Sequence, residues 1–146
     1  MRFRGQRRCW WMVQISIDYA GKLHCSATHG PSHTELETDA PLDNMGKGES
    51  FSPTDLVATA LGTCIATTMA IVAEREGVEL KGMKVQVQKE MADAPRRIGR
   101  LTTEVRIPLP ASHPKRELLE QTALGCPVHR SLPPGMERPT TFFWEG

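Results

Sequence analysis

The chain has 146 residues and a mass of 16.2 kDa, enough for one domain with a single core and too little for two ordinary domains. Hydrophobic residues make up 39% and charged residues 24%, which excludes both a disordered chain and a membrane-embedded one. The net charge of +1 argues against a protein that works on nucleic acid.

The first 11 residues differ from the rest in charge, because they hold four arginines and no acidic residue. Neither an apolar stretch nor a small-residue cleavage site follows, so this is not the pattern of a signal peptide. We predict that residues 1–12 form an N-terminal extension, a surface arm, and that residues 13–146 form one domain. A cytoplasmic, reducing location is expected, where structural disulfides are rare. The question is then which cysteines do chemistry among Cys9, Cys25, Cys64 and Cys126.

Hairpins and helices alternate along the rest of the chain. We predict strands over 13–19, 22–28 and 35–38, a loop over 39–51, a long helix from residue 53, strands over 83–90 and 98–107, a helix over 112–124, a short helical turn to residue 132 and a strand over 140–144. The strands at 13–19 are expected to be half-buried because apolar and polar residues alternate. The order βββ-α-ββ-α-β, with hairpins segregated from helices, predicts an α+β fold.

The clearest predicted element is the helix that begins at Pro53. Ser52 is placed as its N-cap, Pro53 as its first helical residue and Asp55 as an acid in its first turn. From residue 56 to 73 the helix is apolar on almost every side, so it must be buried centrally or covered by a partner. No run of the chain approaches the ~18 apolar residues of a transmembrane helix, and no membrane association is expected.

Two cysteines lie at positions that suggest chemistry. Cys64 is on the long helix, about 18 Å from its start at ~1.5 Å per residue, so the helix dipole does little for its thiol. A small core residue is its simpler interpretation, and reactivity would need an arginine, a histidine or a hydrogen-bond donor from elsewhere. Cys126 opens a helical turn, where free backbone N–H groups favour a thiolate, although an ordinary capping cysteine is the alternative.

Cofactor and metal motifs do not emerge from the sequence. Cys126 and His129 have the C-x-x-H spacing of half a zinc site, but the second half is missing. Glycine-rich nucleotide loops and the G-x-S-x-G and H-E-x-x-H motifs do not occur. We therefore expect neither a cofactor nor a metal.

Two segments resemble the OsmC/Ohr family. Residues 50–66, SFSPTDLVATALGTCIA, are similar to the family's central helix, and residues 125–132, GCPVHRSL, are similar to its second cysteine motif. Residues 38–49, TDAPLDNMGKGE, resemble a loop of its OsmC-like branch. The order of predicted elements from residue 13 to 144 also agrees with the family.

The resemblance implies a fold, an assembly and a reaction. The fold would be an intertwined homodimer in which two long central helices pack together and sheets from both chains wrap them. The reaction would be reduction of an organic hydroperoxide or hydrogen peroxide in oxidative-stress defence. Cys64 would attack the peroxide and become a sulfenic acid, Cys126 would resolve it as a disulfide, and a dithiol reductant would reopen the disulfide.

The activating pair of the family does not transfer to this chain. Family peroxidases carry a glutamate ten positions before the first cysteine, paired with an arginine that activates the thiolate. Thr54 stands at that position, Asp55 is about 100° further round the helix, and the N-terminal hairpin has no arginine. Glu49, Asp55 and Arg130 are therefore the candidates for supporting or activating roles.

Two other interpretations stay open. In one, the chain is a non-catalytic dimer that binds a small hydrophobic ligand or senses redox state, with regulatory or vestigial cysteines. In the other, both cysteines only fill the core. Replacing Cys64 by serine distinguishes the peroxidase from the ligand-binding dimer, because it should abolish peroxide turnover but spare ligand retention.

Overall fold

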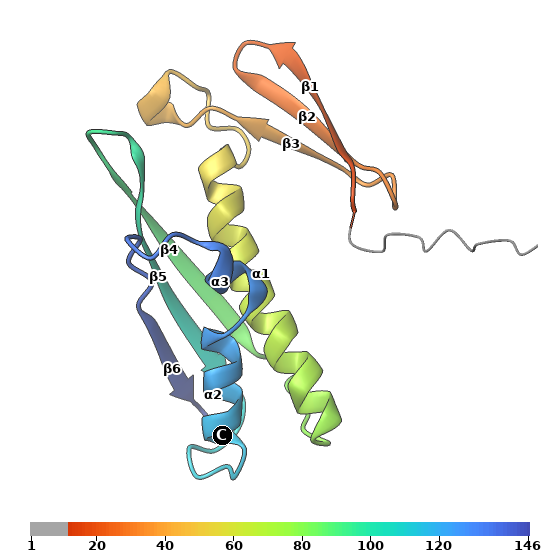
Figure 1. Ribbon diagram of the computed structural model, residues 1–146, viewed down its shortest axis with the longest axis vertical. Helices are drawn as coiled ribbons and strands as arrows, with labels where there is room; N and C mark the ends of the chain where they lie inside the picture. Colours follow the sequence, from red (N-terminus) through yellow and green to blue (C-terminus); the bar gives the residue numbers. More distant parts are fainter. Residues whose placement is uncertain (1–11) are drawn as a thin grey trace, which may run out of the picture. The chain divides into compact units, whose positions relative to one another are not determined.

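The computed structural model describes residues 12–146, so the predicted extension lies outside the described residues except for Met12. The elements are β1 (Ile15–Gly21), β2 (His24–His29), β3 (Glu35–Asp39), the 3-10 helix η1 (Leu42–Asn44), α1 (Pro53–Arg75), β4 (Lys84–Ala92), β5 (Arg97–Ile107), α2 (Arg116–Leu124), α3 (Pro127–Ser131) and β6 (Thr140–Trp144) (Figure 1). They confirm the predicted α+β fold and its order, with η1 added in the loop and α3 as the short helical turn. The chain divides into two compact units between Pro53 and Thr54.

The first unit is built on the antiparallel sheet β1-β2-β3. A tight turn joins β1 to β2, and three successive residues in it, Gly21, Lys22 and Leu23, have positive φ. The prediction of a half-buried first strand is wrong for the single chain, because Ile17 is 65% exposed and Ile15 and Tyr19 are similarly exposed. The alternation is present, but within one chain the apolar side chains of β1 stay in contact with solvent.

The segment between β3 and α1, predicted as an open loop over 39–51, folds back on itself. The Asp39 N–H donates to the Phe51 carbonyl at 3.1 Å, which closes the base of the loop. The Gly46 N–H donates to the Pro41 carbonyl at 3.0 Å, around η1. A Cβ at Gly46 would lie within 1.6 Å of the Ala40 carbonyl oxygen, so only glycine fits there.

The second unit packs helices on one sheet. Strand β4 pairs antiparallel with β5, and β6 adds in parallel on the other side of β5. Helix α1 turns a continuous row of side chains toward this sheet, and the row and the inner face of β5 share one core with residues of α2. The row consists of Ala58, Leu61, Gly62, Ile65, Met69 and Ala73.

The outward side of α1 is made mostly of small and polar residues, with Ile71 as an exposed large apolar side chain. Thr59 and Thr63 are exposed, and each hydroxyl donates to a carbonyl one turn back. By length and composition alone α1 is apolar enough to cross a membrane, with a mean hydropathy of 2.0 over its best window, contrary to the expectation from uninterrupted apolar runs. Its buried row packs on the sheet as a core helix does, which accounts for part of this hydropathy, because 33% of that window is buried within the single chain.

Helix α2 begins at Arg116, four residues later than predicted. Residues 110–116 form two successive turns instead, in which the His113 N–H donates to the Pro110 carbonyl and the Arg116 N–H to the His113 carbonyl. The Lys115 N–H is taken by the His113 ring at 3.2 Å. These local bonds satisfy the backbone groups that an earlier helix start would have used.

Candidate active site

Helix α1 holds Cys64 on the flank of its buried row. The Cys64 side chain is half-buried and packs at the edge of the hydrophobic core. Its Sγ lies 3.8 Å from the hydroxyl oxygen of Thr68, one turn further along the helix. The thiol is therefore partly accessible and has a polar neighbour on its own helix.

Cys126 occupies the junction between α2 and α3. It is the N-cap of α3, in an extended conformation, with Pro127 as the first helical residue. The Cys126 side chain is completely buried, and its Sγ accepts a hydrogen bond from the His129 N–H at 3.4 Å. The proline fixes the helix start, and the sulfur replaces the oxygen that usually caps such a start.

The structure brings the two predicted cysteines together. Burial raises the pKa of the Cys126 thiol, and the hydrogen bond and negative charge of a neighbouring Cys64 thiolate raise it further. The hydrogen bonds from the N–H groups of His129 and Val128 lower this pKa. The expectation that the helix start makes Cys126 a thiolate is wrong, because α3 has only five residues and burial outweighs its N–H groups.

The raised pKa of Cys126 distinguishes the two thiols. Cys126 holds its proton more tightly when the neighbouring Cys64 is charged. Cys126 then stays a thiol and serves as a donor to the Cys64 sulfur. The half-buried cysteine is thus the potential nucleophile, and the buried one is its neutral neighbour.

His129 was not among the predicted site residues. Burial lowers the pKa of its imidazole, and the positive charge of Arg138 lowers it further. Arg138 is itself held by the carbonyls of Leu132 and Pro133, at 2.9 and 3.1 Å. The ring is therefore neutral at pH 7, and His129 acts on Cys126 through its backbone N–H. The C-x-x-H spacing is the sequence signal for this contact between the His129 N–H and the Cys126 sulfur, although the spacing alone indicates only half a zinc site.

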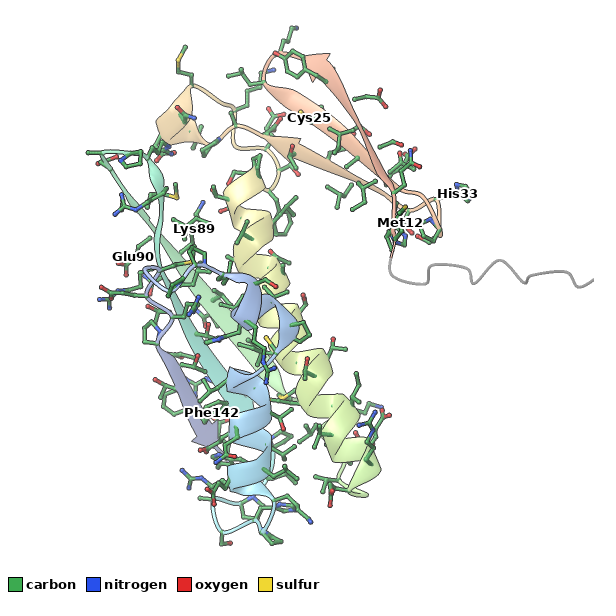
Figure 2. The ribbon with its side chains drawn as sticks, in the orientation of Figure 1. Met12, Cys25, His33, Lys89, Glu90 and Phe142 are labelled. Carbon is green, nitrogen blue, oxygen red and sulfur yellow. The ribbon has the colours of Figure 1, made fainter. Side chains whose placement is uncertain are left out.

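Asp55, a predicted supporting residue, is ion-paired across the interface between helix and sheet. Lys89 lies on β4 (Figure 2). Its amine is 2.7 Å from the Asp55 carboxylate and donates to the Thr54 hydroxyl at 2.8 Å. Asp55 is nine residues before Cys64, about 13.5 Å along the helix at ~1.5 Å per residue. The acid at the helix start therefore holds a lysine, in the region where the family's glutamate would hold an arginine.

The other two predicted supporting residues lie in different surroundings. Arg130 is on α3, its N–H donates to the Cys126 carbonyl at 3.0 Å, and its guanidinium lies close to Gly125, so it is adjacent to the cysteine motif. Glu49 belongs to the first unit, where its N–H donates to the Asp39 carboxylate at 3.1 Å and its side chain is exposed. The roles of Glu49, Asp55 and Arg130 in activation remain predictions.

The remaining cysteines are separate from this pair. Cys25 is half-buried on β2, paired in register with Tyr19 and Thr38 of the first sheet (Figure 2). Cys9 lies outside the described residues. Within residues 12–146, no group of three or more His, Cys, Asp or Glu side chains gathers closely enough to hold a metal ion.

The chain is similar to a family of known proteins. The family model for OsmC-like protein matches residues 46–137, a range that includes both Cys64 and Cys126. A Psychrobacter arcticus protein, named for osmotic-stress induction and detoxification response, is 37% identical, covers 90% of this chain and 96% of its own, and has a TM-score of 0.85. Among curated proteins, no sequence matches the chain.

More distant structures share the fold. An organic hydroperoxide resistance protein from Legionella pneumophila is 14% identical, with 93% of this chain and 99% of that one covered and a TM-score of 0.75. One from Bacillus subtilis is 15% identical, with 90% and 98% covered and a TM-score of 0.66. The match of the family model over most of the chain, together with the 37% identical relative, shows that the chain belongs to the family of OsmC-like proteins.

Proposed function

We propose that the protein is a thiol-dependent peroxidase that reduces organic hydroperoxides, with hydrogen peroxide as a poorer substrate. The observation that carries the proposal is the meeting of a half-buried Cys64 with a fully buried, protonated Cys126 at one junction of helices. Relatives named for organic hydroperoxide resistance share the fold. The family membership supports a place in stress response, and we propose a cytoplasmic location.

The first half-reaction oxidises Cys64. Its thiolate attacks one oxygen of the peroxide, an S–O bond forms as the O–O bond breaks, and the other oxygen takes a proton from solvent and leaves as an alcohol. Cys64 is then a sulfenic acid. The Cys126 sulfur attacks it, an S–S bond forms, the S–O bond breaks, and water leaves with the thiol proton. Peroxide has gained two electrons and the two thiols have become a disulfide.

The second half-reaction needs a dithiol reductant. Because the Cys126 sulfur is fully buried, the reductant's thiolate attacks the Cys64 sulfur and Cys126 leaves. The second thiol of the reductant then attacks the mixed disulfide, which releases Cys64 and completes the reductant's own disulfide. The N–H groups of His129 and Val128 support the departing Cys126 sulfur.

We also propose that the working form is a homodimer. The apolar side chains of β1 are exposed in the single chain, and the outward side of α1 carries small residues that allow a second helix to approach closely. Burying such surfaces against a second copy would remove apolar area from water. Light scattering on the eluting protein gives the mass that tests this.

The test of the peroxidase proposal is intact mass and non-reducing peptide mapping within seconds of adding one equivalent of cumene hydroperoxide. A Cys9→Ser, Cys25→Ser background removes the two other thiols. The reduced protein should lose two hydrogens as a Cys64–Cys126 disulfide, more slowly with hydrogen peroxide. Adding Cys126→Ser should leave a sulfenic acid on Cys64, and adding Cys64→Ser should leave the protein unchanged. No oxidation of the folded protein on this timescale would refute the peroxidase proposal.

A cavity supports the second candidate function, binding of a small hydrophobic ligand. It has a volume of about 380 Å³ and is lined by α1 and the segment that follows it. Ala66, Ala70, Leu80 and Met83 give it an apolar part, and Glu74, Glu79 and Lys81 give it a charged part. If this is the function, a bound apolar compound should survive Cys64→Ser, whereas peroxide turnover should not.

A further inference from the structure

Three threonines of α1 use their hydroxyls in two different ways. Thr59 donates to the Asp55 carbonyl at 2.9 Å, and Thr63 donates to the Thr59 carbonyl at 2.8 Å. This bond to the carbonyl four residues back is the ordinary choice of a threonine within a helix. The Thr68 hydroxyl instead lies 3.8 Å from a side chain four residues back, the sulfur of Cys64.

The surroundings of this contact give it a role. Both side chains are half-buried, so the contact is shielded in part from water. Among residues 12–146, the polar groups that interact with the Cys64 sulfur are the Thr68 hydroxyl and the Cys126 thiol, and both are uncharged. A thiolate in such a place depends on hydrogen bonds for its stability, because neither neighbour supplies positive charge.

We propose that Thr68 is an activating and positioning residue for Cys64, whose hydroxyl donates a hydrogen bond to the thiolate and holds it for attack on the peroxide. This inference rests on the proposed peroxidase function for the last clause only. The hydroxyl can donate to or accept from the thiol, but it can only donate to the thiolate, so the bond favours the charged form. Thr68 keeps its own proton throughout.

The donors on the Cys64 sulfur come from two elements. Toward a Cys64 thiolate, the Thr68 hydroxyl can only donate, from α1 itself, and the Cys126 thiol donates from the junction of α2 and α3. When Cys64 is oxidised, Cys126 is consumed in the disulfide, but Thr68 is not. The Thr68 hydroxyl therefore takes no covalent part in the cycle. Its substitution tests the hydrogen bond and leaves both reacting sulfurs in place.

The experiment compares Thr68→Val, which keeps the shape and loses the donor, with Thr68→Ser, which keeps the hydroxyl. Thr63→Val is the matched control, because its hydroxyl bonds a carbonyl on the same helix. All are made with Cys9→Ser and Cys25→Ser. The first readout is the rate of Cys64 alkylation by iodoacetamide from about pH 5 to 10, followed by peptide mapping. The second is oxidation by cumene hydroperoxide at pH 7.

For Thr68→Val, we expect the midpoint of the alkylation profile to move up by about half a pH unit to one unit and the rate at pH 7 to fall about three- to tenfold. Thr68→Ser should restore the profile, and Thr63→Val should not move it. An unmoved profile in a folded Thr68→Val protein would overturn the inference, and Thr68→Ala serves if valine prevents folding. A shifted profile without any peroxide oxidation would uphold the contact and reject the peroxidase function, so the two failures are distinguishable.

Discussion

The two sheets carry similar alternating patterns of apolar residues but use them differently. In the second unit, the inward residues of β5, such as Leu101 and Val105, are completely buried under α1 and α2. In the first unit, Ile15, Ile17 and Tyr19 of β1 are more than half exposed. The second unit therefore closes a core of its own, while the first carries apolar surface that its own chain leaves in water.

The difference bears on the site. Both cysteines of the candidate pair belong to the second unit, where α1, α2 and α3 are fixed by the buried core. The first unit holds neither of these cysteines, and the base of its loop over 39–51 is closed by backbone bonds and by the Asp39 carboxylate. The chemistry of the pair is thus built on the self-sufficient unit, and the exposed strand β1 is the surface that a second copy would have to cover.

The largest expected effect distinguishes the buried core of the second unit from the exposed strand β1 of the first unit. Leu101→Ala removes a fully buried side chain beneath α1 and should lower the free energy of unfolding by about 2–5 kcal/mol. Ile17→Ala, on the exposed strand, should change the stability of dilute monomer by about 0.5 kcal/mol or less. Urea unfolding monitored by circular dichroism measures both. Equal losses for the two variants in the monomer would contradict the comparison.

Varying the protein concentration gives a second test with the same two variants. If β1 is covered in a homodimer, Ile17→Ala should weaken association and make the unfolding midpoint fall more steeply on dilution. Leu101→Ala should lower the midpoint at every concentration. A protein that elutes as a monomer at all concentrations, with no effect of Ile17→Ala, would reject the dimer.

The second unit was the easier part to predict from the sequence. The N-cap, the proline start and the long apolar run of α1 are local signals, and they placed Cys64 on a buried helix. The failures concern what local signals do not contain. Burial of β1 depends on what covers it, and the pKa of Cys126 depends on a core assembled from distant segments. Thr68 had only its spacing from Cys64 as a signal, and threonines elsewhere on α1 have the same spacing to other partners.

A smaller effect tests how closely α1 is fitted to its sheet. Alanine at Gly62 would gain about 1 kcal/mol of helix propensity. Its Cβ, however, would lie 2.9 Å from a methyl carbon of Val87, and such overpacking costs about 1–3 kcal/mol. We expect a net loss of about 1 kcal/mol in urea unfolding. Adding Val87→Ala should remove the clash, so the double variant should show coupling between the two sites. A Gly62→Ala protein more stable than the original would refute this fit.

The smallest expected effect belongs to the first unit and depends on pH. The His24 ring contacts the Asp39 carboxylate at 2.6 Å, and the other carboxylate oxygen accepts the Glu49 N–H. The bond to Asp39 raises the pKa of His24 above its ordinary 6.5 against the cost of burial, with a further contribution from Glu37. The bond from His24 lowers the pKa of Asp39 below its ordinary 3.8, although burial raises it. The backbone N–H of Glu49 and the positive charge of Lys47 lower this pKa further.

The sign of the pH dependence follows from these directions. The raised pKa of His24 contributes stability that is complete below pH 6.5 and is lost as the pH rises through the pKa of His24 in the folded protein. The lowered pKa of Asp39 contributes stability that is present above pH 3.8 and is lost as the pH falls through the pKa of Asp39 in the folded protein. The loop over 39–51 should therefore be held best between those values and loosen in alkali. Hydrogen exchange of the Glu49 amide, corrected for intrinsic rates, should show less protection at about pH 8.5 than at about pH 5.5. His24→Gln should remove this difference, and His29→Gln, on the same strand but bonded to Ser32, should keep it. Protection that does not change with pH in the original protein would mean that the backbone bonds at the base of the loop hold it without the ion pair.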